Sequence, residues 1–202
     1  MNTARKNRRF PVLLLLPVVF ALQWALPLLQ VARGEDILRN GVSLRLELEP
    51  VDPLDVLRGR YLALAFPEER TQHPLPPGAQ SGDTIYVVLE AGKDGLAHIT
   101  RLSHSVQDGA FAYRVPGNYK GGDKITVKIP LTRYYLPEED AVKIDELFRF
   151  RGNETPRSNA SLGVRIKDGQ IIAESLWIDG QPYRNWLHSY QNTPASKSQK
   201  DL

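Results

Sequence analysis

Histidines, serines and clustered carboxylates are the residues whose chemistry could support catalysis or metal binding in this chain. The four histidines are spread along the sequence as His73, His98, His104 and His188. No pair has the HExxH spacing that places two imidazoles on one helix face around zinc, and no Gly-x-Ser-x-Gly turn presents a serine nucleophile. The chain has no cysteine, which excludes thiol catalysis, thiolate metal sites and disulfides. We predict no catalytic residue, no metal site and no cofactor.

The densest group of carboxylates follows Pro137 and consists of Glu138, Glu139 and Asp140. Paired acids can exchange protons or hold a cation, but acids in a first turn also favour the positive end of a helix dipole. Apolar residues recur at helical spacing after them, so we predict a helix over Glu138–Phe148.

An N-terminal membrane segment must position everything that follows. An uncharged apolar run over residues 10–31 comes directly after four basic residues, Arg5, Lys6, Arg8 and Arg9. A helix of this length spans about 33 Å, enough for a hydrocarbon core of about 30 Å. Basic residues stay on the cytoplasmic side. We predict a cytoplasmic segment over 1–9, a single-pass inner-membrane anchor over 10–31, and a periplasmic or otherwise extracytoplasmic remainder.

A cleaved secretory signal is the alternative for this segment. The apolar core of a signal is normally about 7 to 15 residues long, and a small-residue site follows it; Ala32-Arg33-Gly34 could supply that site. The longer run favours an uncleaved anchor. Pro17 and Pro27 each leave a carbonyl without a backbone donor, which predicts bends that could rest against a partner helix. A single span that tolerates these defects is the simpler interpretation.

The positive net charge of the chain belongs mainly to this N-terminal segment. The sequence has 26 basic and 23 acidic residues, and four basic residues precede Phe10, which leaves 22 against 23. No basic excess remains to neutralise phosphates, so we predict no nucleic-acid binding. Residues 35–190 are enough for one domain with its own core, whereas the polar residues 191–202 predict a disordered tail.

Alternating apolar and polar residues predict that the outer domain is built from strands. Such alternation covers residues 42–49, 124–129 and 162–167. Asp94-Gly95 and Asp168-Gly169 predict hairpins, because a tight hairpin turn needs positive φ at its centre. The hairpins join strands over 84–90 with 96–102 and over 162–167 with 170–178. Proline-rich residues 71–82 and residues 152–159 predict loops.

We therefore predict a mainly β fold, a barrel or sandwich with one short helix, plus one N-terminal transmembrane helix. Directly after the first predicted strand the chain reads VDPLDVLRGRYLALAF. This segment resembles the signature Gly-Asp-Tyr-x-x-Leu-x-Tyr of the GDYXXLXY family of bacterial membrane-anchored proteins. Gly59, Tyr61 and Leu64 match the signature, while Arg60 replaces its Asp and Phe66 its final Tyr.

The resemblance extends over nearly the whole chain. The apolar anchor, first strand, Asp-Pro, Arg-Gly-x-Tyr, Asp-Gly hairpin, Tyr-Leu-Pro-Glu and final Ile-Asp-Gly-Gln-Pro-Tyr follow the layout of the family in order. The family has no established activity, and its members look like partners of polytopic membrane proteins. The resemblance thus implies a membrane partner and implies no reaction.

The motif segment has a structural and a functional interpretation. Structurally, Asp-Pro begins a turn, Gly59 allows a tight entry into a strand, and Leu62, Leu64 and Phe66 face the core at a barrel corner. Functionally, the segment would contribute to a polar groove for a peptide or partner loop, with the candidate binding residues Asp52, Arg58, Gly59, Tyr61, Tyr135 and Glu138.

Together these observations predict a membrane-tethered domain that is not an enzyme and that binds or stabilises a polytopic membrane protein. The alternative is a periplasmic hydrolase, or a ligand- or glycan-binding module, that uses the same groove.

Overall fold

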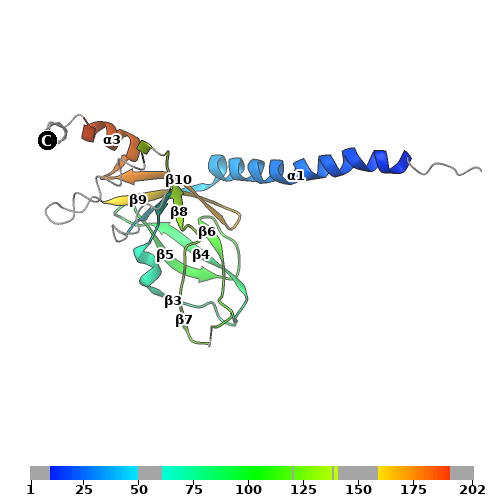
Figure 1. Ribbon diagram of the computed structural model, residues 1–202. Coiled ribbons are helices and arrows are strands. Elements are labelled where there is room, and N and C mark those ends of the chain that lie inside the picture. Colours follow the sequence, from blue (N-terminus) through cyan, green and yellow to red (C-terminus); the bar gives the residue numbers. More distant parts are fainter. Residues whose placement is uncertain (1–9, 50–60, 120, 138, 141–158, 192–202) are drawn as a thin grey trace, which may run out of the picture.

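A long N-terminal helix leads directly into a β-rich domain (Figure 1). The structure is a computed structural model that describes residues 10–49, 61–119, 121–137, 139–140 and 159–191. The helix, α1, comprises Phe10–Asn40 and projects away from the domain, so that most of its length contacts no other part of the chain that the structure describes.

Helix α1 is one continuous element that includes Pro17 and Pro27. It extends nine residues beyond Val31, where the predicted membrane anchor ends. Two side-chain pairs one turn apart support the added turns, an Arg39–Glu35 ion pair of 3.1 Å and an Asn40–Asp36 hydrogen bond of 2.7 Å. The prediction from apolarity stopped where charged residues begin, although such residues form exposed helix readily.

Helix α1 ends against the sheet that contains Arg165 and Lys167. We call the contact a helix–sheet joint and define it as Asp36, Ile37, Gly41, Arg165 and Lys167. Ile37 is buried, and the Gly41 N–H donates to the Ile37 carbonyl over 2.8 Å. The Lys167 ammonium pairs with the Asp36 carboxylate at 2.6 Å, and the Arg165 guanidinium donates to the Gly41 carbonyl at 3.2 Å. The sheet therefore holds the last turn of the helix by both packing and polar contacts.

Two antiparallel sheets form the larger part of the domain. The first has the order β1-β9-β10-β11, from β1 (Val42–Glu47), β9 (Ala160–Lys167), β10 (Gln170–Ile178) and β11 (Gln181–Pro182). The second has the order β5-β4-β6, from β4 (Thr84–Ala91), β5 (Ala97–Ser103) and β6 (Ala110–Arg114). The Ala112 N–H donates to the Gly169 carbonyl over 2.7 Å and so joins an edge of the second sheet to the β9–β10 turn.

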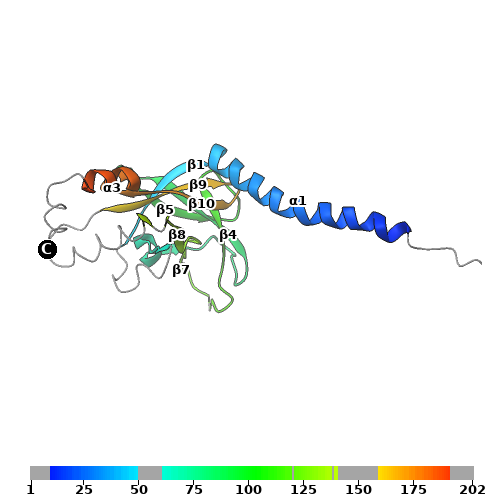
Figure 2. The same cartoon turned by 45° about the horizontal axis from the view of Figure 1, so that its top comes forward.

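Two short strand pairs complete the described sheets. Strand β2 (Tyr61–Ala63) pairs with β8 (Arg133–Tyr135), and β3 (Gln72–Pro74) pairs with β7 (Lys124–Thr126). A 3-10 turn, η1 (Pro67–Arg70), follows β2, and a C-terminal helix, α3 (Tyr183–Gln191), lies beside the first sheet (Figure 2). The described strands form no closed barrel, so the barrel alternative does not hold for them.

One hydrophobic core joins the sheets. Alternate residues of β1, β9 and β10 meet alternate residues of β4, β5 and β6 there, and the fully buried members include Leu46, Leu162, Ile166, Leu176, Ile178, Ile85, Val87 and Phe111. Both main sheets thus bury one face, which is what the period-2 alternation in the sequence predicts.

Several expectations from the sequence are confirmed and others need correction. The first strand and both Asp-Gly hairpins are present. The ladder predicted over 124–129 stops at Thr126, because the Ile129 N–H donates to the Glu69 carboxylate at 2.9 Å instead of to a strand. The predicted loop over 71–82 contains strand β3, in which Pro74 takes the end position of a two-stranded pair.

The helices also differ from expectation. Glu139 and Asp140 are helical, but the rest of the helix predicted over Glu138–Phe148 lies outside the described residues, as do the predicted segments 1–9 and 192–202. Helix α3 was missed, because its sequence follows a strand and a turn and lacks a long apolar stripe. Tyr183 and Leu187 lie one turn apart, and both side chains are buried against the core, which holds α3 in place.

Candidate functional site

Two of the six predicted binding residues, Tyr61 and Tyr135, are described and lie side by side. They form a cross-strand pair of β2 and β8, with ring centroids 6.1 Å apart in an edge-to-face arrangement. Asp52, Arg58, Gly59 and Glu138 lie outside the described residues. The structure thus brings together two predicted residues that are far apart in the sequence.

Arg133 belongs to the same surface and was missed in the sequence. It is two residues before Tyr135, so both side chains lie on one face of β8, and its guanidinium stands 4.7 Å from the centroid of the Tyr61 ring. Its partner in the ladder is Ala63, whose small side chain leaves room for this stacking. We call Tyr61, Arg133 and Tyr135 the aromatic cluster. The two-residue spacing from Tyr135 was the available signal for Arg133.

The aromatic cluster is open to solvent at Tyr135, whose exposed fraction is 69%. The opposite face of the same strands is anchored. Leu62 and Phe66 are buried in the core as predicted, and burial raises the pKa of the half-buried Tyr134. A firmly held strand pair therefore presents two tyrosines and an arginine outward, a residue set common at protein interfaces.

Turn η1 fixes the motif strand to the rest of the domain through its carboxylates. Glu69 accepts from the Ile129 N–H at 2.9 Å, and the Arg70 guanidinium pairs with Glu49 at 2.7 Å. Glu68 accepts from the Ile99 N–H at 3.2 Å and from the His98 ring at 2.7 Å. Since η1 comes directly after the motif segment, these contacts set where the aromatic cluster lies.

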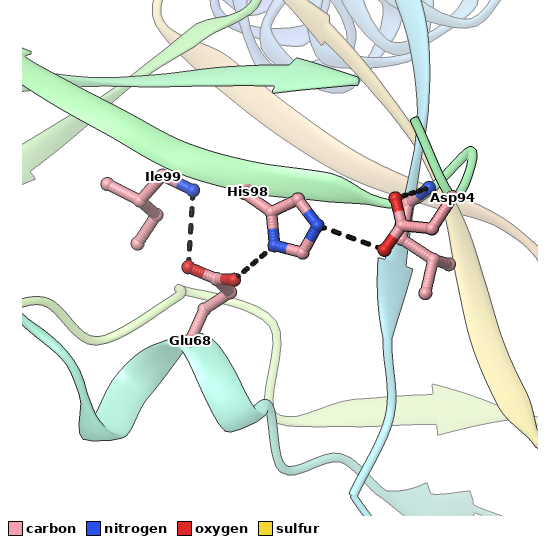
Figure 3. Close-up of polar contacts among 5 residues, drawn as sticks. Glu68, Asp94, His98 and Ile99 are labelled. Carbon is pink, nitrogen blue, oxygen red and sulfur yellow. Dashed lines mark hydrogen bonds and ion pairs between the residues drawn. The ribbon is translucent and has the colours of Figure 1, made fainter. Parts of the chain in front are cut away.

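A second polar cluster centres on His98 of strand β5 (Figure 3). The Nδ1 atom of His98 lies 2.7 Å from Glu68 Oε1, and Nε2 lies 3.2 Å from Asp94 Oδ2. The carboxylates of Glu68, first, and of Asp94 raise the pKa of His98. The Leu96 N–H, and to a smaller extent His98, lower the pKa of Asp94. We call Glu68, Asp94 and His98 the histidine clamp.

The geometry of the histidine clamp is not that of a metal site or a catalytic base. The two carboxylates approach opposite nitrogens of the ring, so they do not converge on one ion (Figure 3). Ionised carboxylates only accept hydrogen bonds, so a doubly protonated His98 ring satisfies both of them and offers no lone pair to a substrate. No group of three or more potential metal ligands occurs among the described residues. The clamp ties η1 to the β4–β5 hairpin.

His73 in β3 has the opposite environment. Its side chain is buried, its Nε2 atom has no hydrogen-bond partner among the described residues, and burial lowers its pKa. A neutral imidazole in this position acts as a core side chain, and its partner in the ladder is Ile125.

A small hollow lies over the outer face of the first sheet. Its volume is about 240 Å³, and Ser43, Arg45, Glu174, Ser175 and Trp177 are among its lining residues. The Arg45 guanidinium covers the Trp177 ring at 4.4 Å, and Arg165 neutralises Glu174 at 2.9 Å. Small-molecule sites usually exceed this volume, and Arg45 takes one face of the indole on which a sugar could otherwise stack.

The described residues define a β-rich domain with one N-terminal helix that is long and apolar enough, over Leu16–Asn40, to span a membrane. The chain belongs to the GDYXXLXY protein family, whose model matches residues 23–176 and so includes both strands of the aromatic cluster. This finding confirms the resemblance seen in the motif segment. No curated protein and no solved structure matches the chain.

Proposed function

We propose that the chain is a membrane-anchored protein whose β-rich domain lies outside the cytoplasm and binds and stabilises a polytopic membrane protein. The observation that carries this proposal is the rigid connection between an exposed apolar helix and the domain. The exposed helix supports a membrane anchor, and the helix–sheet joint supports an anchor that is not cleaved.

The apolar part of α1 supports an anchor. Its large apolar side chains are between 54% and 67% exposed, and they are Leu16, Val18, Val19, Phe20, Leu22, Trp24, Leu26, Leu28, Leu29 and Val31. Soluble proteins rarely leave a continuous apolar surface of this size in water. The hydrocarbon core of a bilayer would remove this apolar surface from water. The basic residues before Phe10 favour a cytoplasmic N-terminus.

The helix–sheet joint supports an uncleaved anchor. Helix α1 continues without a break through the small residues Ala32 and Gly34, and Ile37, three residues later, is buried. A cut at this triplet would remove the turns that lead into the joint. The domain follows at Val42, only one residue after the joint, so it would lie close to the membrane surface.

This position favours a partner in the same membrane. From Val31 to Asn40 the helix rises about 13 Å, roughly twice the depth of one headgroup layer, so the domain begins just above the membrane surface. A domain held at this height reaches the extracytoplasmic loops of a neighbouring membrane protein more readily than it reaches a soluble partner. The exposed Tyr135 of the aromatic cluster offers the kind of amphipathic anchor that dominates many interfaces.

Co-purification from mild detergent tests the proposal. The full chain, carrying an affinity tag, should retain a multi-span membrane protein, and Y135A should reduce its yield about tenfold, as expected for loss of an interface anchor of about 1.4 kcal/mol. V106A is the control, because Val106 is also exposed, at 50%, and belongs to the loop between β5 and β6 instead of the motif strand. Recovery of the chain alone, from the soluble fraction or from the membrane, would contradict the proposal.

The alternative of a hydrolase or a glycan-binding module gains no support from the described residues. Both ring nitrogens of His98 lie against carboxylates of the domain itself, and the hollow beside Trp177 is small, with Arg45 over the indole ring.

A further inference from the structure

Two glutamines share one face of the otherwise apolar part of α1. Gln23 and Gln30 are seven residues apart, and Pro27 lies between them at the i+4 position, so all three lie within about 60° on the helix surface. We call Gln23, Pro27 and Gln30 the glutamine stripe. All three side chains are exposed, and neither carboxamide has a hydrogen-bond partner among the described residues.

Pro27 adds a third polar group to this stripe. In an α-helix the N–H of residue 27 would donate to the carbonyl of residue 23, but proline has no N–H. The Gln23 carbonyl therefore lacks its helical donor. The stripe presents two carboxamides and one backbone acceptor along about two turns of helix.

Such groups are costly in hydrocarbon. Burying an amide without a hydrogen bond costs about 1 to 3 kcal/mol by protein-based measures. At Gln23, about 12 Å inside the predicted end of the anchor at Val31, no water is present to take the place of a partner. Among the described residues α1 is the one helix long enough to span a membrane, so a satisfying group must come from another molecule. Interhelical hydrogen bonds from such side chains are a common contact between membrane helices.

The position of the β-rich domain argues against a second copy of the chain as that molecule. Gln23, Gln30 and Ile37 follow one another at seven-residue intervals, so they lie on one face of α1. Ile37 is the residue that packs on the domain. The domain therefore overhangs the same face as the stripe, and two parallel helices packed through it, about 8 to 10 Å apart, would bring both domains into the same space.

We infer that the glutamine stripe is the docking surface of α1 for one transmembrane helix of a polytopic partner, and that this helix offers hydroxyl or carboxamide side chains at the depth of Gln23 to Gln30. Such a helix can end at the membrane surface beneath the overhanging domain. The inference rests on the proposed function and specifies where within the membrane the partner binds.

Site-specific photo-crosslinking in the intact membrane tests this surface with the full chain. A benzophenone side chain is placed at position 23 or 30, and as matched controls at Leu22 or Leu29, which are also exposed but lie about 80° or more away from the stripe. Adducts should form at 23 and 30 at least tenfold more than at 22 and 29. Mass spectrometry should locate the crosslinked peptide in a transmembrane segment of a multi-span protein.

Substitutions provide the second measurement. Q23L together with Q30L should lower the yield of that same co-purified protein about tenfold without loss of membrane insertion, since leucine only increases apolarity. Q23N with Q30N should restore much of the yield, and L22A with L29A should leave it unchanged. An unchanged yield in the leucine variant would overturn the inference.

The crosslinks distinguish the possible failures. An adduct of twice the chain mass would mean that a second copy occupies the stripe, and lipid adducts alone would mean that no helix docks there; either result overturns the inference. If a crosslinker at Tyr135 still captures a multi-span protein, the proposed function stands and only the stripe is wrong. If neither position captures one, the proposed function fails as well.

Discussion

The two hairpins of the domain contain the same tripeptide, Lys-Asp-Gly, yet they form different turns. In the β9–β10 hairpin Lys167 pairs directly with Gln170, and both Asp168 and Gly169 have positive φ, 50° and 79°. In the β4–β5 hairpin only Gly95 has positive φ, and the Gly92 N–H closes a longer loop on the Leu96 carbonyl. The tripeptide predicts a hairpin, whereas the register of the strands decides which turn it makes.

The two turns also have different surroundings. Gly169 lies against the second sheet, where its carbonyl accepts from Ala112, and the neighbouring Lys167 holds the end of α1. The β4–β5 turn is open around Gly95, and its Asp94 side chain contacts His98 in the histidine clamp. One turn therefore connects sheets and helix within the structure, and the other displays a titratable group at the surface.

The largest difference between the hairpins should appear in G169A. Alanine at a φ of 79° is strained, by about 1 kcal/mol or more, and its Cβ would lie 3.0 Å from Cε1 of the Tyr86 ring. We expect the free energy of unfolding to fall by about 2 kcal/mol in total. Urea unfolding of the full chain in detergent, followed by tryptophan fluorescence, measures it. A loss below about 0.5 kcal/mol would show that Tyr86 and the turn relax freely.

G95A is the matched substitution in the other hairpin and should have a smaller effect. Gly95 has the same φ of 79°, but no atom lies within 4 Å of the position its Cβ would take. Only the backbone strain remains, so we expect a loss of about 1 kcal/mol in the same unfolding experiment. Equal losses for G95A and G169A would contradict the role assigned to the contact between the β9–β10 turn and Tyr86.

Local patterns in the sequence predicted the elements that they determine. Alternation predicted β1 and β9, and the two Asp-Gly pairs predicted the hairpins, because both signals depend on neighbouring residues. Tyr61 and Tyr135 were predicted to line one groove, but no local pattern indicated that their strands pair. Glu68 and His98 are 30 residues apart, and no local pattern indicates that η1 folds back on β5.

The smallest expected effect is a pH dependence that arises at the β4–β5 hairpin and not at β9–β10. The pKa of His98 is raised in the folded chain, so its clamp stabilises the fold fully below the unfolded pKa of about 6.5 and loses this effect as pH rises through the folded pKa. His73 has a lowered pKa, so it destabilises the fold as pH falls below about 6.5. The two histidines partly cancel in the wild-type chain.

Comparison of H98Q with the wild type removes the contribution of His73, which both chains share. The wild type should be more stable than H98Q at pH 5.5, by about 0.5 kcal/mol because the His98 side chain is 44% exposed, and the difference should shrink by pH 8.5. E68Q should lower the pKa of His98 more than D94N does, because Glu68 is the larger cause of the shift, and NMR titration of the ring protons measures this order. An unshifted His98 in the wild type, or a stability difference that grows with pH, would mean that the clamp does not form in solution.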